Sequence, residues 1–156
     1  MNKPIAKLRS GLSSLLRDYE DIWCRLKPTE LRSLWDPAED APFYIAEEIA
    51  EPIYDWPTLE QYWADAEQIL IKFSIRTRDL RCKEVAPGLA VLNFVMHWNG
   101  VLRGLEHNPL GLDVRVSALA RDVQGEWRFC HYIESPLGPL PYLMNSYSGN
   151  VDKDFL

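Results

Sequence analysis

Residues 71–104 read "IKFSIRTRDLRCKEVAPGLAVLNFVMHWNGVLRG", which is two long runs separated by the turn-forming triplet "APG" (86–88). Apolar and polar residues alternate through much of both runs, and a period of two is typical of strands because successive side chains point to opposite faces. Two similar runs follow, "LDVRVSALARDV" (112–123) and "EWRFCHYIE" (126–134), after the turn-rich segments "LEHNPLG" and "QG". The four runs predict four long strands of an antiparallel sheet.

The chain ahead of these strands has the spacing of helices. Between Ile5 and Leu26 apolar residues recur at steps of three or four, which predicts an amphipathic helix that ends before Pro28. A short helix is expected at "TELRSLW" (29–35), and "FYIAEEIAEPIY" (43–54) predicts two short extended pieces, since proline is tolerated at a sheet edge. Helices followed by long strands predict an α+β domain, with the helices packed on one face of a curved antiparallel sheet.

A third helix is predicted over "PTLEQYWADAEQIL" (57–70). Thr58 followed by Gln61 is a capping-box pattern, so we expect Thr58 to cap this helix. The apolar positions that share one face of it are Leu59, Tyr62, Trp63, Ala66, Ile69 and Leu70.

Size and composition limit the classes of function that the chain can have. With 156 residues, 47% of them hydrophobic, residues 1–156 are expected to form one domain, with a core at about 10–137 and a C-terminal tail at 138–156. Twenty-three acidic against 17 basic side chains give a net charge of −6, which disfavours a nucleic-acid partner. No apolar run approaches the roughly 18 residues that span a bilayer, so no membrane partner is expected.

The spacing of cysteine and histidine argues against several kinds of site. Cys24, Cys82 and Cys130 are far apart and form no CxxC pair, which indicates neither a disulfide scaffold nor a zinc site and favours the reducing cytoplasm. The sequence has no HxH or HExxH motif, so no metal ion is expected. It also lacks a GxSxG elbow and a glycine-rich phosphate loop, and we expect no cofactor.

Three stretches resemble a known superfamily. They are "YIAEEIAEPIYDWPTLEQYW" (44–63), "VLNFVMHWN" (91–99) and "GEWRFCHYIESP" (125–136). In order, they are similar to the first strand pair and its helix, the long central strand and the final strand of nuclear transport factor 2-like proteins. This superfamily includes SnoaL-like cyclases, ketosteroid isomerases and the association domain of calcium/calmodulin-dependent kinase. The resemblance covers about residues 10–137 and implies a cone-shaped, cystatin-like fold, but the superfamily hosts enzymes, binding modules and scaffolds.

The last strand supplies the first candidates for a pocket. Its alternation predicts one face with Trp127, Phe129, His131 and Ile133, and the opposite face with Arg128, Cys130, Tyr132 and Glu134. The resemblance implies that the face of Tyr132 and Glu134 opens to the pocket. His131 is then expected to have a structural role or to lie at an interface with a second sheet.

Other elements are expected to complete this pocket. The resemblance implies that Asn93 and His97 reach it from the central strand. Of Glu47 and Glu48 only one can point inward, and we expect Glu47. The full set of candidates is Tyr19, Trp23, Glu47, Trp63, Asn93, His97, Tyr132 and Glu134. In the kinase association domain the equivalent wall positions are rich in arginine, whereas here they are Val95, Ala118 and Glu134, so an anion-binding pocket of that kind is not supported.

The candidate residues allow three functional interpretations. The first is a SnoaL-like protein with a pocket for a small apolar or amphipathic ligand, whose identity the sequence does not give. The second is an isomerase, cyclase or hydratase, because an aromatic-walled cavity raises the pKa of a carboxyl group, and Glu134 beside His97 could then move a proton. The third is a non-catalytic, dimeric assembly domain, in which Glu134 is an exposed residue at a strand end and His97 is structural.

A partner surface is also expected. If the helices cover one side of the sheet, the other side stays open, and apolar residues alternate through both faces of "VLNFVMHW" and "VRVSALA". The resemblance implies that this open side forms a homodimer.

Overall fold

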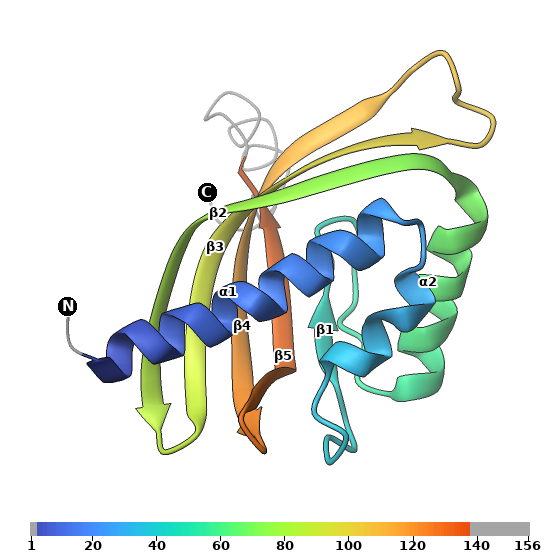
Figure 1. Cartoon of the computed structure of the whole chain (residues 1–156). Coiled ribbons are helices and arrows are strands. Elements are labelled where there is room, and N and C mark those ends of the chain that lie inside the picture. Colours follow the sequence, from blue (N-terminus) through green and yellow to red (C-terminus); the bar gives the residue numbers. More distant parts are fainter. Residues whose placement is uncertain (1–2, 138–156) are drawn as a thin grey trace, which may run out of the picture.

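The computed structural model describes residues 3–137, and the predicted tail at 138–156 lies outside the described residues. A long N-terminal helix crosses one face of a strongly curved sheet, and a second helix lies beside the end of the sheet where the second strand begins (Figure 1). The elements are α1 (Lys3–Cys24), the 3-10 helix η1 (Pro28–Leu34), β1 (Phe43–Ile45), α2 (Trp56–Ile69), β2 (Leu70–Ala86), β3 (Leu89–Leu102), β4 (Leu110–Val123) and β5 (Glu126–Pro136).

The sheet has the strand order β1-β5-β4-β3-β2. Its four long strands pair antiparallel with their sequence neighbours, so the predicted antiparallel arrangement is confirmed. The short strand β1 adds a parallel edge beside β5, with Tyr44 opposite Tyr132. The sheet is therefore mixed. Because β1 runs parallel to β5, the loop that follows β1 lies next to the end of β5.

The core lies between α1 and the concave face of the sheet. On α1 the buried residues repeat at the helical spacing that the sequence predicts: Leu8, Leu12, Leu15, Leu16, Tyr19, Ile22 and Trp23. On the central strands the buried residues repeat at every second position: Ala90, Leu92, Phe94 and Met96 on β3, and Val114, Val116, Ala118 and Ala120 on β4. The residues between them point to the opposite, convex face, as the pleat of a strand requires.

A β-bulge in β5 changes which residues share a face. Leu119 pairs with His131 and Ala120 pairs with Phe129, which leaves Cys130 as an extra residue on β5. Because of this insertion, Phe129 and Tyr132 both face the helices, and His131 faces outward. The predicted alternation, which placed Phe129 and His131 together, is therefore wrong across Cys130, although Tyr132 and Glu134 do share a face.

The crossing of α1 over β5 explains a glycine inside the helix. A Cβ atom at Gly11 would lie 2.5 Å from Cδ1 of Trp127, so only glycine leaves room for this indole ring. Glycine lowers the stability of a helix interior, and here the lost helix propensity permits a close contact between helix and sheet.

The start of α2 differs from the predicted capping box. The N-cap is Asp55, whose carboxylate accepts hydrogen bonds from the backbone amide of Thr58 at 2.8 Å and from its hydroxyl at 2.9 Å. Thr58 is therefore a donor within the first turn and not the cap. The helix begins earlier than predicted, at Trp56, because proline is tolerated in the first turn of a helix and Pro57 can lie there.

None of the helices among residues 3–137 is long and apolar enough to cross a membrane.

Candidate functional site

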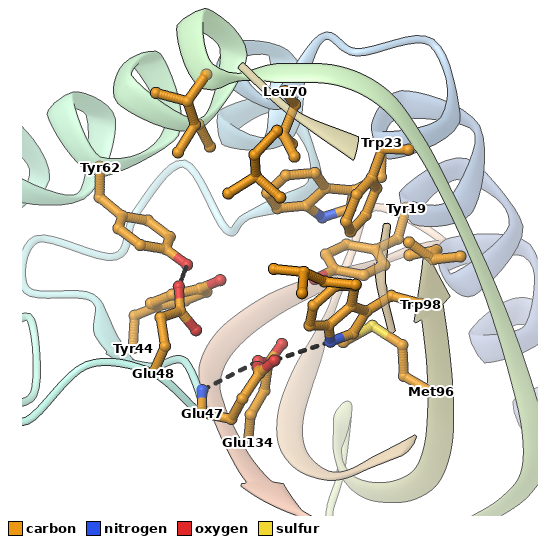
Figure 2. Close-up of a pocket in the computed structure, with 16 residues that line it drawn as sticks. Tyr19, Trp23, Tyr44, Glu47, Glu48, Tyr62, Leu70, Met96, Trp98 and Glu134 are labelled. Atoms are coloured by element: carbon orange, nitrogen blue, oxygen red, sulfur yellow. Dashed lines mark hydrogen bonds between the residues drawn. The ribbon is translucent and has the colours of Figure 1, made fainter. Parts of the chain in front are cut away.

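A cavity of about 330 Å³ lies between the concave face of the sheet, the C-terminal half of α1 and the last turns of α2 (Figure 2). Ile69 at the end of α2 and Leu110 at the start of β4 both line it and are both exposed, so the cavity reaches the surface between them. Six aromatic side chains make up much of the remaining wall: Tyr19, Trp23, Tyr44, Tyr62, Phe73 and Trp98.

Part of this wall is a row of three stacked or tilted rings from three elements. Trp23 of α1 lies 5.3 Å from Phe73 of β2, measured between ring centroids, and Phe73 stacks on Trp98 of β3 at 5.8 Å. Contacts of this kind between aromatic side chains contribute beyond the apolar area that they bury, so the rings support one another. The row gives the cavity a flat apolar side.

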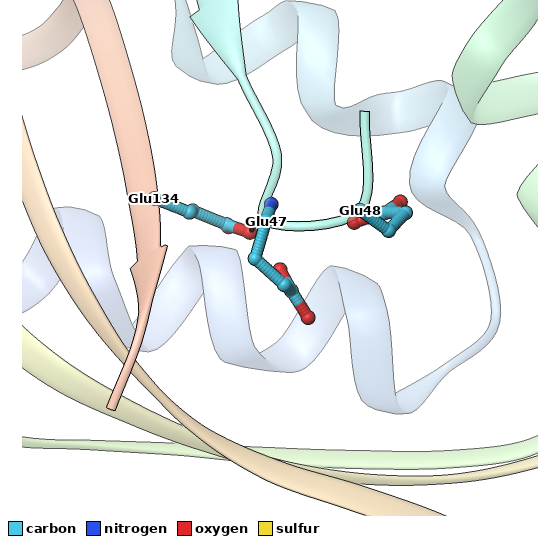
Figure 3. A group of neighbouring side chains, drawn as sticks. All are labelled: Glu47, Glu48 and Glu134. Carbon is cyan, nitrogen blue, oxygen red and sulfur yellow. Dashed lines mark hydrogen bonds between the residues drawn. The ribbon is translucent and has the colours of Figure 1, made fainter. Parts of the chain in front are cut away.

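Three carboxylates gather at the other end of the cavity (Figure 3). Glu134 projects from β5, and Glu47 and Glu48 come from the loop that follows β1 (Figure 3). One carboxylate oxygen of each lies within 4.8 Å of the others, an arrangement that could hold a metal ion. The parallel pairing of β1 with β5 brings Glu134 close to the two loop glutamates, although Glu47 and Glu134 are 87 positions apart in the sequence.

Hydrogen bonds fix the orientation of each carboxylate (Figure 2). The indole nitrogen of Trp98 donates to Oε1 of Glu47 at 2.8 Å, and the hydroxyl of Tyr62 donates to Oε1 of Glu48. Oε2 of Glu134 accepts a longer hydrogen bond, 3.3 Å, from the backbone amide of Glu47. Hydrogen bonds from Trp98 and Tyr62 thus join the aromatic wall to the acidic cluster.

Glu134 has the most unusual environment of the three. Glu134 is only 7% exposed. Desolvation by this burial raises the pKa of its carboxyl group well above the ordinary value of 4.5, and the nearby carboxyl group of Glu47 raises it further. Burial likewise raises the pKa of the Tyr19, Tyr44 and Tyr132 hydroxyls, which therefore stay neutral. The site favours a protonated Glu134 surrounded by neutral phenols.

The structure brings together several of the candidates that the sequence suggested. Tyr19, Trp23, Glu47 and Glu134 all line the cavity. Tyr132 lies behind this wall, 1% exposed, and its hydroxyl donates to the hydroxyl of Tyr19 at 3.0 Å. Trp63 is also 1% exposed and packs in the core near Tyr44 rather than lining the cavity.

The predicted positions of Asn93 and His97 are wrong. Both side chains lie exposed on the convex face, where the amide of Asn93 donates to Ser117 at 3.1 Å and His97 pairs with Asp113 at 3.0 Å. The inward positions of β3 are the even-numbered ones, which carry Phe94, Met96 and Trp98. Among residues 3–137, no histidine lines the cavity beside Glu134, so the expected pairing of Glu134 with His97 is wrong.

The sequence analysis did not find most of the residues that line the cavity, among them Tyr44, Glu48, Tyr62, Phe73 and Trp98. For Trp98 a signal existed, because the polar residues Asn93, His97 and Asn99 occupy alternate positions and mark the solvent face of β3. For Glu48 no such signal existed. It follows the strand in a loop, where the alternation that excluded it no longer holds.

Comparisons with known proteins bear on the fold. A scan against models of protein families found no match, and a search of curated proteins found none. Among solved structures, a proposed scytalone dehydratase from Novosphingobium aromaticivorans superposes with a TM-score of 0.73 at 14% identity, over 87% of this chain and 96% of the other.

Two further structures are similar. A proposed dehydratase of the nuclear transport factor 2-like family from Streptomyces avermitilis has a TM-score of 0.71 at 12% identity, over 83% of this chain and 96% of the other. A proposed calcium/calmodulin-dependent protein kinase II association domain from Xanthomonas campestris has a TM-score of 0.67 at 12% identity, over 81% and 85%. The chain therefore has the α+β, cystatin-like fold of nuclear transport factor 2-like proteins, as the resemblance of its sequence implied.

Proposed function

We propose that this protein binds a small, mostly apolar molecule in the cavity and exchanges a proton with it through Glu134. The observation that carries the proposal is a carboxyl group that is more than nine-tenths buried in an aromatic-walled cavity, with its pKa raised by that burial. A carboxyl group of this kind can act as a general acid near neutral pH, whereas an exposed glutamate is ionised there. Fold neighbours that are proposed dehydratases add support, because their chemistry requires proton transfer.

The arrangement of the carboxylates suits the removal or addition of water. In a dehydration, a base takes a proton from carbon, an acid gives a proton to the departing hydroxyl group, and water leaves as the carbon–carbon double bond forms. Protonated Glu134 is the proposed acid. The carboxylate of Glu47 is the proposed base, since its side chain lines the same cavity and the indole of Trp98 fixes its orientation. An isomerisation would use the same pair to move a proton between two carbons of the substrate.

The proposal can be tested without knowing the natural substrate. A set of small hydroxyketones and cyclic ketones, incubated with the protein in D₂O, would report proton exchange at carbon by NMR. We expect Glu134→Gln to reduce the exchange rate by about 100-fold or more, the usual contribution of a general acid or base. Glu126→Gln is the matched control, because Glu126 is an exposed glutamate on the same strand, β5.

The outcome also separates the enzyme from a binding protein. Equal rates in the wild type and Glu134→Gln, with ligand still bound in the cavity, would remove the catalytic role and leave a binding protein. Mass spectrometry of molecules that co-purify with the protein would identify what the cavity binds.

We also propose that the protein forms a homodimer through the convex face of the sheet. Half-buried apolar residues lie there on three neighbouring strands, Val95, Leu119 and Ile133, among arginine, aspartate and histidine side chains. A mixture of apolar and charged side chains is typical of the interfaces of non-obligate complexes. A cytoplasmic location is proposed as well, supported by the three unpaired cysteines.

A further inference from the structure

The charge of the cavity restricts which ligands it can accept. Its lining contains the carboxyl groups of Glu47, Glu48 and Glu134, and the lining residues within the described part of the chain include no lysine, arginine or histidine. An anionic ligand would have to leave water and approach these carboxyl groups without any counter-charge. The cavity is therefore suited to a neutral or a positively charged ligand.

The aromatic wall favours the positively charged ligand over the neutral one. A cation is attracted to the face of a tryptophan, tyrosine or phenylalanine ring, and the attraction grows when water is excluded. Here tryptophan and tyrosine rings lie in the same cavity as the carboxyl groups, and the Tyr62 hydroxyl contacts Glu48 directly. We propose that the ligand is an organic cation, an amine or quaternary ammonium compound whose charged group lies among Glu47, Glu48 and Glu134 and whose apolar part packs on Trp23, Phe73 and Trp98. This inference rests on the proposed function, because it names the ligand class of the same cavity.

Glu134 provides an argument that does not depend on the number of acids. A carboxylate can accept about four hydrogen bonds. Within residues 3–137 the geometry gives this one a single long bond, from the amide of Glu47 at 3.3 Å. Glu134 is only 7% exposed and lines the cavity, so acceptor positions of its carboxyl group are left for a ligand or for water inside the cavity. An ammonium group supplies both the charge and the donors, or the methyl groups, that suit such a site.

A metal ion is a weaker match for the cavity as a whole. Magnesium and calcium ions prefer a nearly complete shell of oxygen ligands, and most of the wall away from the three glutamates is aromatic or aliphatic. A cavity of about 330 Å³ is also far larger than an ion requires. The apolar surface has a role only if the ligand has an apolar part.

Affinity for such a cation should rise with pH. The titratable groups around Glu134 are Glu47 and Glu48 of the loop after β1, and the phenols Tyr19 of α1, Tyr44 of β1, Tyr62 of α2 and Tyr132 of β5. The phenols stay neutral because burial raises their pKa values. Burial also raises the pKa of the Glu134 carboxyl group, which loses its proton as the pH rises. Loss of the Glu134 proton then adds negative charge where the cation lies.

Two probes of the same shape test the inference. Benzyltrimethylammonium and its uncharged isostere, 2,2-dimethylpropylbenzene, would be titrated into the protein at pH 5.5 and pH 8.5, with tryptophan fluorescence and NMR as readouts. At pH 8.5 we expect the cation to bind about tenfold or more tighter than the uncharged probe. At pH 5.5 we expect a smaller preference for the cation, because the raised pKa of Glu134 favours its neutral form there. The affinity of the uncharged probe should not change with pH.

Variants show whether the preference arises from the glutamates. Glu134→Gln and Glu48→Gln should each reduce the preference for the cation, and Glu126→Gln should leave it unchanged. Glu48 is exposed, so Glu48→Gln remains informative even if Glu134→Gln fails to fold.

Three results would overturn the inference. Equal or tighter binding of the uncharged probe at pH 8.5 would contradict the proposal that the ligand is a cation. The cavity would remain a binding site, and the proton-transfer proposal would be unaffected. Displacement of the ammonium probe by millimolar magnesium or calcium would assign the three glutamates to a metal ion. Binding of neither probe would remove the proposed ligand class, and the exchange experiment with Glu134→Gln would still decide the proposed chemistry separately.

Discussion

Glu134 is a carboxyl group in a place where its charged form is disfavoured, and this has a consequence for folding. Burial raises its pKa in the folded protein above the ordinary value of 4.5, which an unfolded chain keeps. Between these two pKa values the folded state binds more protons than the unfolded state. The free energy of unfolding therefore falls as the pH rises through this window, and below the unfolded pKa the loss is absent.

Replacing Glu134 by glutamine should remove that pH dependence. We expect the stability of Glu134→Gln relative to the wild type to increase as the pH rises above 4.5, by about 1.4 kcal/mol per pH unit until the wild-type carboxyl group ionises. Urea unfolding of both proteins across this pH range measures the difference. Parallel pH profiles for the two proteins would show that Glu134 is not held in its protonated form.

The sequence could predict some residues of the site and not others. It placed Tyr132 and Glu134 on one face because they are two positions apart, with no irregularity between them. It failed for Asn93 and His97, since alternation gives two faces but does not say which one meets the helices. Polarity would have decided between the faces, because a histidine and an asparagine on a face without partners are more stable in water than in a core.

At the scale of the elements, the long strands and the two main helices could be predicted because their patterns extend over many residues. The pairing of β1 could not, since a three-residue strand has almost no pattern and its partner lies nearly 90 positions away: Tyr44 pairs with Tyr132. The site glutamates of the β1 loop depend on this pairing. Because the pairing of β1 with β5 brings the three glutamates together, the acidic cluster could not be predicted from the sequence.

The close contact of α1 with β5 at Gly11 should make a larger side chain there destabilising. Alanine there would be a better helix former by roughly 1 kcal/mol, but its Cβ would overlap the ring of Trp127. We expect Gly11→Ala to lower the free energy of unfolding by about 1–3 kcal/mol, the usual cost of overpacking. Chemical denaturation measures this change.

Ser10→Ala is the matched control for Gly11→Ala, because Ser10 is exposed on the same helix. It should be neutral or slightly stabilising. A Gly11→Ala protein that is more stable than the wild type would show that α1 and Trp127 are not in close contact at this position.

At the scale of the whole molecule, the elements described at residues 3–137 cover one face of the sheet with helices and leave the other face open. If the open face forms the proposed homodimer, light scattering coupled to gel filtration should give twice the 18.1 kDa mass of the chain. Ile133→Arg should shift the protein to a monomer, because the new charge would lie between two sheets. Ile5→Arg, an exposed position on α1 across the sheet, should leave the mass unchanged. A monomeric wild type at micromolar concentration would remove the dimer and with it the assembly interpretation.

The extra residue in β5 also matters for comparing this chain with its structural neighbours. Omitting Cys130 from the sequence restores an unbroken alternation, with Trp127, Phe129, Tyr132 and Glu134 on the helix side. The strand is thus a regular strand with a one-residue insertion, and a homologue without the bulge would be one residue shorter here. Any alignment that continues through Cys130 without a gap would exchange the two faces of the sheet and pair Glu134 with a residue that points into solvent.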